Sequence, residues 1–165
     1  MTPEFVIEKF QLEPLPIEGG LFRRFYAADE SIARDALPSR YARAKLLGSA
    51  ICYMHTPQTR SLLHCLKTDE IYHFYNGDPV ALVMLHPEGS YQVVTLGRDY
   101  AAGHLPFFVV PRGVMQGSCL LEGGAWALLG ATMAPAYDDD DFELGERAAL
   151  IEKYPSAREW IERLT

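Results

Sequence analysis

The chain has 165 residues, of which 48% are hydrophobic and 22% charged, and its formal net charge is -7 at pH 7. This length fits a single domain, and the composition is that of a globular protein rather than a disordered one. The acidic balance and the scattered lysines and arginines argue against a nucleic-acid partner and against an anionic membrane surface.

Cysteine usage and the N-terminal residues indicate the compartment. The three cysteines, Cys52, Cys65 and Cys119, lie far apart, and each stands inside an apolar run. An odd number of cysteines without a CxxC pair predicts free, buried thiols in a reducing environment. The N-terminus has no basic stretch followed by an apolar core, and no apolar run reaches membrane-spanning length. We therefore expect a cytoplasmic protein.

The N-terminal part of the chain predicts three elements. Residues 3–10 carry a helical apolar stripe behind Thr2, which can cap a short helix. Glu18-Gly19-Gly20 predicts a turn, and residues 21–26 a strand that could pair with a second chain along its edge. The polar residues 31–44 predict a loop over the surface.

From Leu46 onward the pattern is typical of a β protein. Short apolar runs alternate with Gly, Pro, Asn and Asp, and Asn76-Gly77-Asp78-Pro79 is a strong hairpin signal. Regularly spaced short strands predict an antiparallel sandwich or barrel. The expected strands are residues 50–54, 62–66, 71–75, 80–85, 91–96, 107–110, 114–121 and 125–133.

The C-terminal residues predict a helical tail. Residues 143–165 are amphipathic and read as one or two helices, interrupted at Pro155 and packed on the outside of the barrel. The four acids of residues 138–141 predict a solvated loop before this tail. We therefore expect one domain over residues 1–165, with the barrel spanning about residues 18–135.

Two segments resemble the cupin motifs. His64, Glu70 and Gly77 have the spacing of the first motif, in which the second histidine is replaced here by Leu66. Residues 110–116 resemble the second motif, and Gln116 occupies the place of its histidine.

A wider resemblance runs through residues 18–22, 68–79, 109–116, 132–135 and 141–144. Taken together, these segments are similar to the DUF985 group of cupins, also called Cupin_5. The resemblance implies an all-β fold, a double-stranded β-helix or jelly-roll barrel with a short N-terminal helix and C-terminal helices. The resemblance also implies a dimer, which is common in this group, and similarity to sugar-nucleotide epimerases and seed-storage cupins.

Strand alternation assigns side chains to the barrel interior. Successive residues of a strand face opposite sides, so Tyr72 and Phe74 face inward if Glu70 does, while His73 faces outward. The cupin resemblance puts His64 on the inner face, with Gln116 opposite. The sequence therefore predicts a pocket with catalytic residues His64, Glu70 and Tyr72 and ligand contacts from Phe74, Gln116, Arg112, Tyr53 and Arg23.

Three functions fit these residues. The first is metal-free proton transfer on a small carbonyl or sugar compound, in the manner of an epimerase or isomerase, with His64 as base and Glu70 as its partner. The second is a metalloenzyme with a divalent metal. Its ligand set is incomplete, because Leu66 replaces a histidine and glutamine is a poor ligand, so no cofactor is expected. The third is a binding module for a small molecule, or a structural homodimer, without turnover.

Overall fold

Two antiparallel sheets organise the chain in the computed structural model, which describes residues 1–165. One sheet has six strands in the order β1-β2-β5-β12-β7-β10, and the other has five in the order β13-β6-β11-β8-β9. The six-stranded sheet contains β1 (Glu13–Pro14), β2 (Leu21–Ala27), β5 (Ser49–His55), β7 (Glu70–Gly77), β10 (Phe107–Val110) and β12 (Ala127–Met133). The five-stranded sheet contains β6 (Ser61–Leu66), β8 (Val80–Leu85), β9 (Tyr91–Leu96), β11 (Met115–Leu120) and β13 (Phe142–Leu144).

The main hydrophobic core lies between the two sheets. It combines Tyr53, Tyr72 and Phe74 of the first sheet with Leu82 and Met84 of the second. Side chains of both inner faces therefore interdigitate as in a jelly roll, which confirms the expected all-β fold. Strand pairing does not run continuously around the molecule, however, so the two sheets form an open sandwich rather than a closed barrel.

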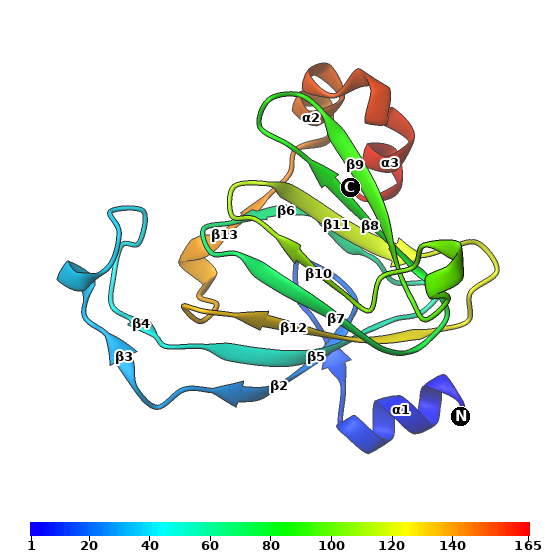
Figure 1. Cartoon of the computed structure of the whole chain (residues 1–165), viewed down its shortest axis with the longest axis horizontal. Helices are drawn as coiled ribbons and strands as arrows, with labels where there is room; N and C mark the ends of the chain where they lie inside the picture. The colour runs from blue at the N-terminus through cyan, green and yellow to red at the C-terminus, as the bar shows by residue number, and fades with distance from the viewer.

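Helices cover the outer faces of both sheets (Figure 1). Helix α1 (Pro3–Phe10) begins at Thr2, whose hydroxyl accepts a hydrogen bond from the Phe5 amide, and it packs on the six-stranded sheet through Val6. Helices α2 (Arg147–Lys153) and α3 (Arg158–Arg163) pack on the five-stranded sheet through Leu150 and Ile161. None of the helices has the length and apolar character needed to cross a bilayer.

Two segments differ from the sequence expectation. Residues 31–46 are not simply a loop, because β3 (Ser31–Ile32) pairs with β4 (Lys45–Leu46) in a hairpin that projects at the left of Figure 1. The first residues of the expected helical tail form β13, which pairs with β6. Four single 3-10 turns complete the chain: η1 (Arg34–Ala36), η2 (Tyr100–Ala102), η3 (Asp139–Asp141) and η4 (Pro155–Ala157).

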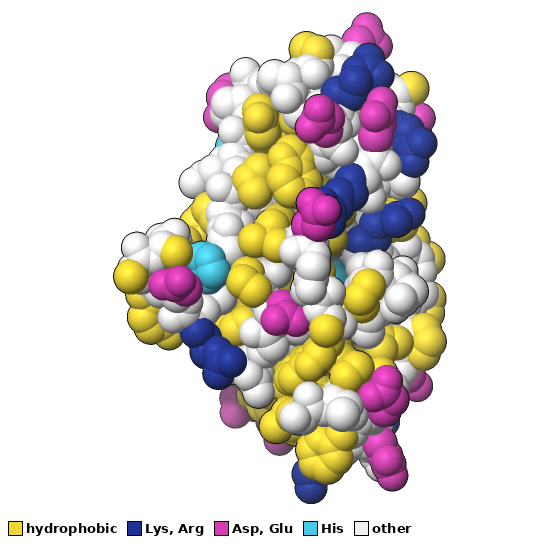
Figure 2. All heavy atoms as spheres, turned by 90° about the vertical axis from the view of Figure 1, so that its right-hand side faces the viewer, with side chains coloured by type: hydrophobic (Ala, Val, Ile, Leu, Met, Phe, Trp, Pro, Cys, Tyr) yellow, Lys and Arg dark blue, Asp and Glu magenta, His cyan; other side chains and the backbone are white.

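The surface mixes apolar and charged side chains without a basic face in the view drawn. Figure 2 shows hydrophobic side chains along the middle and lower part of one side of the molecule. Charged side chains of both signs are more frequent toward the end that carries the C-terminal helices.

Candidate ligand-binding site

A cavity of ≈ 410 Å³ opens at one end of the space between the sheets. Nine of its 15 lining residues are hydrophobic, and the polar ones are few, which is typical of a site for a small molecule. The apolar walls include Phe22, Ile51, Leu66, Met133 and Phe142, and the ionisable lining residues are Glu18, Arg24, Glu70, Tyr137 and Asp139.

Glu70 reaches the cavity from the first position of β7. Its side chain is 8% exposed, and Gln116 of β11 donates a hydrogen bond from Nε2 to Oε2 over 2.7 Å. Burial raises the pKa of the Glu70 carboxyl to about 7, and the negative charge of Glu18 adds to the rise. The neighbouring His64 and the hydrogen bond from Gln116 act in the opposite direction. Near neutral pH this carboxyl can therefore either take up or give away a proton.

His64 faces inward because β6 contains a bulge. Gln116 pairs with His64 and Ser118 with Ser61, so β6 holds one extra residue between the two pairs. The bulge is possible because Gly117 lies there: a Cβ at Gly117 would stand 2.9 Å from the Ser61 carbonyl oxygen. The extra residue rotates His64 to the side that Ser61 occupies, and leaves the carbonyl of Leu62 free for the imidazole.

The imidazole of His64 is held in one orientation. Nδ1 lies 2.7 Å from the Leu62 carbonyl oxygen, which can only accept, so Nδ1 carries the hydrogen and Nε2 is left as an acceptor. The ring stacks on Phe142 with 5.0 Å between centroids. Burial lowers the pKa of His64, although Glu70 partly offsets this, and the ring is therefore neutral at pH 7.

Glu18 is a site residue that the sequence alone did not single out. The turn before β2 directs it inward, with Gly19 at φ 91° and Gly20 at φ 78°, a region that favours glycine. The Ser61 hydroxyl donates to Glu18 Oε1 over 2.8 Å. Burial raises the pKa of Glu18 to about 7, against the effect of that hydrogen bond. The signal available in the sequence was an acid followed by two glycines.

Both glycines of this turn make close approaches that no side chain would allow. A Cβ at Gly20 would lie 2.0 Å from the Tyr53 hydroxyl oxygen, and a Cβ at Gly19 would lie 2.4 Å from the Arg60 carbonyl oxygen. The Tyr53 hydroxyl donates to the Gly19 carbonyl over 2.8 Å, which fixes the turn against β5. Tyr53, which the sequence predicts as a ligand contact, therefore holds the turn that carries Glu18.

The structure brings some predicted site residues together and separates others. His64, Tyr72 and Gln116 are buried around Glu70. Glu70 lines the cavity directly, whereas these three lie behind it, and Phe74 belongs to the core between the sheets. His73 faces outward, as alternation predicts, and lies 3.1 Å from the Thr132 hydroxyl.

Arg23 and Arg112 do not line the cavity. On β2 the neighbouring residues Phe22 and Arg24 face inward, so alternation turns Arg23 to the other side of the sheet. Arg112 is exposed and pairs with Asp69 at 3.5 Å, beside a separate surface groove. Of the arginines, it is Arg24 that stands at the cavity, where it is exposed at the rim.

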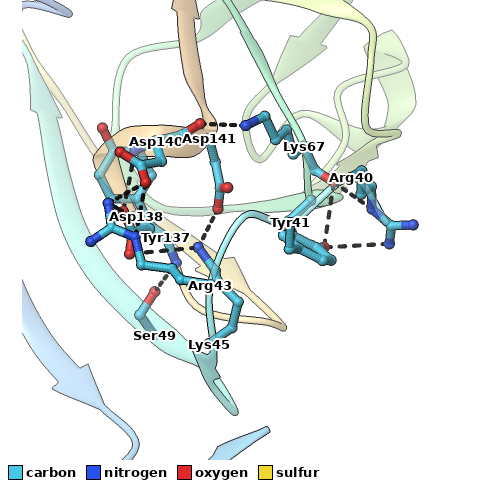
Figure 3. Close-up of polar contacts among 11 residues, drawn as sticks. Arg40, Tyr41, Arg43, Lys45, Ser49, Lys67, Tyr137, Asp138, Asp140 and Asp141 are labelled. Atoms are coloured by element: carbon cyan, nitrogen blue, oxygen red, sulfur yellow. Dashed lines mark hydrogen bonds and ion pairs between the residues drawn. The ribbon is translucent and has the colours of Figure 1, made fainter. Parts of the chain in front are cut away.

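The segment after β12 closes the cavity and is held by basic residues from other elements (Figure 3). Arg43 pairs with Asp138 and Asp140, and Lys45 of β4 forms an ion pair with Asp141. Lys45 and Asp141 are both buried, at 2% and 3% side-chain exposure. The acidic run is therefore not simply solvated, since its last carboxylate anchors the wall that contains Phe142.

The two stacked sheets and the cavity that opens between them define a jelly-roll protein of the cupin class. A family model described as "Cupin superfamily (DUF985)" matches residues 4–145, and the chain belongs to this family, Cupin_5. No match was found among the curated proteins.

Solved structures agree with this assignment. A crystal structure of a Shewanella oneidensis protein is 30% identical, with a TM-score of 0.88 over 100% of this chain and 98% of that one. A hypothetical protein from Leishmania major is 26% identical, with a TM-score of 0.88 over 100% and 99% of the two chains. Oxalate decarboxylase of Bacillus subtilis is 14% identical, with a TM-score of 0.55 over 94% of this chain and 38% of that one, and shares only the fold.

The donor set around Glu70 differs from what a metal-binding cupin needs. Three or four oxygen or nitrogen ligands must converge on one point to hold a transition metal. Leu66 has no such atom, and the amide nitrogen of Gln116 is directed at Glu70. No group of three or more His, Cys, Asp or Glu side chains is arranged to hold a metal ion.

Proposed function

We propose that this protein binds a small molecule with a polar end in the cavity between the sheets and transfers a proton on it, in the manner of an isomerase or epimerase. The observation that carries the proposal is a pair of carboxyl groups, Glu18 and Glu70, which line one mainly apolar cavity and both have a pKa raised to about 7. A general acid or base works best when its pKa lies near the working pH.

The two carboxyls suit opposite roles. At neutral pH the pair holds about one proton, because each group is close to half-titrated. The ionised carboxylate would remove a proton from a carbon next to a carbonyl group, and the protonated partner would return one to the product. Glu18 and Glu70 come from different segments, the turn before β2 and the start of β7, and both line the cavity.

The residues behind Glu70 would set its protonation. Gln116 donates a hydrogen bond to the carboxyl, which acts against the rise in its pKa. We place His64 in a supporting role, because Nδ1 is taken by the Leu62 carbonyl and the ring lies behind the cavity wall. The reaction is proposed to need no metal, since the motif positions 66 and 116 hold leucine and glutamine.

Exchange of substrate hydrogen with solvent tests the proposal. The purified protein would be incubated in D₂O with a panel of small ketones, aldehydes and keto sugars, and deuterium uptake followed by mass spectrometry. Glu70→Gln and Glu18→Gln should lower exchange by at least about a hundredfold, which is the usual contribution of a general base. Arg112→Ala should leave it unchanged, because Arg112 lies in another groove. Equal exchange in wild type and both glutamine variants would reject the proposal.

We further propose that the protein forms a homodimer. Strand β1 pairs only with Leu21 and Phe22, so the rest of β2 has a free edge, where Phe25 and Tyr26 are 57% and 55% exposed. A free edge with exposed aromatics favours pairing with a second chain. Light scattering should give a dimer for the wild type and a monomer for Phe25→Lys. A monomeric wild type rejects this proposal.

The free cysteines Cys52, Cys65 and Cys119 support a reducing, cytoplasmic location.

A further inference from the structure

The carboxyls of Glu18 and Glu70 have no cationic partner in the chain. Salt bridges elsewhere use Arg43, Lys45, Arg112 and Arg158, and none reaches either carboxyl. The hydrogen bonds that the two carboxyls accept come from the neutral side chains Ser61 and Gln116. Two acidic groups that face one cavity without compensation attract a positive charge from outside the chain.

Most of the hydrogen-bond donors around the two carboxyls are already used. Ser61 donates to Glu18, Gln116 to Glu70, Tyr53 to the Gly19 carbonyl, and His64 Nδ1 to the Leu62 carbonyl. The Gln116 amide oxygen is buried without a partner. The carboxyl oxygens and this amide oxygen are acceptors that remain free. A ligand group that binds at this end must donate hydrogen bonds, whereas a carboxylate or phosphate would meet oxygen lone pairs and like charge.

The other ionisable groups at the cavity do not offset the negative charge of the two carboxyls. His64 is neutral, because burial lowers its pKa. Burial also raises the pKa values of Tyr53, Tyr72 and Tyr137, which are uncharged at pH 7. At the rim, Arg24 and Asp139 are both exposed and of opposite charge.

From this arrangement we infer that the cavity selects a protonated amine with an apolar body, whose ammonium group lies between Glu18 and Glu70. This inference goes beyond the function proposed above and rests only on the same cavity being a ligand site, because an ammonium group between the two carboxyls would displace the proton that the proposed reaction needs. An ammonium group supplies both the charge and the hydrogen-bond donors that the carboxyls lack. Ile51, Leu66 and Phe142 supply the apolar walls for the rest of the ligand.

A matched set of probes tests the charge preference. Cyclohexylamine, cyclohexanol and cyclohexanecarboxylate share one ring and differ in the group that enters the acidic end. By calorimetry at pH 7, cyclohexylamine should bind at least about tenfold more tightly than cyclohexanol, and the carboxylate should not bind. Glu18→Gln and Glu70→Gln should each remove the preference for the amine over the alcohol, whereas Glu152→Gln on α2 should keep it.

Proton release gives a second readout. The pKa values of about 7 mean that binding a cation expels the proton that the pair shares. Calorimetry in buffers of different ionisation enthalpy should show release of up to about one proton per amine at pH 7, and almost none near pH 9, where both carboxyls are already ionised.

The outcomes separate this inference from the proposed function. If cyclohexanol or cyclohexanecarboxylate binds the cavity as tightly as the amine, the amine preference is wrong and the cavity remains a ligand site. If amine binding survives in both glutamine variants, or releases no proton at pH 7, the ammonium position is wrong. If none of the three probes binds, the inference is overturned, and the deuterium exchange experiment decides the proposed function independently.

Discussion

Gln116 and Glu70 meet across the two sheets, with Nε2 of the amide donating to Oε2 of the carboxyl over 2.7 Å. The amide cannot replace a counterion, so the carboxyl keeps a pKa raised to about 7 by its burial. The pKa of Glu70 in the folded protein lies above its ordinary value of 4.5. The folded protein therefore keeps a proton on Glu70 at pH values at which the unfolded chain has released it. The contribution of Glu70 to stability therefore falls as pH rises from about 4.5 to about 7.

Replacing Glu70 by glutamine removes this pH dependence. The unfolding free energy of Glu70→Gln minus that of the wild type should rise by about 1–3 kcal/mol from pH 5 to pH 8. The reason is that the amide stays neutral, whereas the wild-type carboxyl becomes a buried charge at the higher pH. Urea unfolding at several pH values measures the difference. Glu152→Gln, on an exposed position of α2, serves as the control. A difference between Glu70→Gln and wild type that stays constant with pH would contradict the assignment.

The glycines of the turn at Glu18 allow a matched comparison. Gly20 and Gly89 both have positive φ, 78° and 98°, but only Gly20 faces the ring of Tyr53, and nothing lies within 4 Å of a Cβ at Gly89. Gly89→Ala should cost about 1 kcal/mol for backbone strain. Gly20→Ala should cost about 2 kcal/mol more, because the ring must move. Thermal unfolding of the two variants measures this, and equal losses would rule out the close approach.

The buried ion pair of Lys45 and Asp141 should matter more than the exposed one beside it. Lys45→Ala leaves a buried carboxylate without its partner and should cost about 3–5 kcal/mol. Arg43→Ala removes an arginine that is 56% exposed and should cost at most about 1 kcal/mol. Denaturant unfolding compares the two. Similar small losses in both variants would mean that Lys45 does not anchor the wall at Phe142.

Restoring the histidines of the cupin motifs should create a metal site. Leu66→His combined with Gln116→His would place two imidazoles near Glu70 and His64, whose Nε2 is free to coordinate. This variant should retain about one Zn²⁺ or Mn²⁺ per chain after dialysis, whereas the wild type and Leu66→Ala should retain none. Elemental analysis of protein purified without a histidine tag decides. A wild type that retains stoichiometric metal would overturn the metal-free proposal.

Local alternation predicted much of the fold and part of the site. The hairpin at Asn76-Gly77 and the helix over residues 3–10 follow from turn and capping chemistry. On β7, Glu70, Tyr72 and Phe74 are buried while His73 faces outward, as a period of two requires. The same rule puts Arg24 rather than Arg23 on the inner side of β2, once the structure fixes which face is the inner one.

Contacts between distant segments could not be predicted in this way. Glu18 enters the cavity only because the turn before β2 packs against Ser61 and Tyr53, which lie far along the chain. Asp141 looked like one of four solvated acids, and its burial depends on Lys45 in a hairpin that had the composition of a loop. Single-sequence patterns carry local periodicity, but not these pairings.

The extra residue in β6 has a consequence for how this strand could change. Leu63 packs under the C-terminal helices, and the adjacent His64 faces the cavity side. Ser61 faces the cavity side as well, although it lies three residues before His64, because the bulge adds one residue between them. Deleting one residue at position 62 would remove the bulge and restore regular alternation, with Ser61 and His64 still on the same face. A single codon loss would thus keep Ser61 directed at Glu18 but remove the backbone geometry that presents the Leu62 carbonyl to the His64 imidazole.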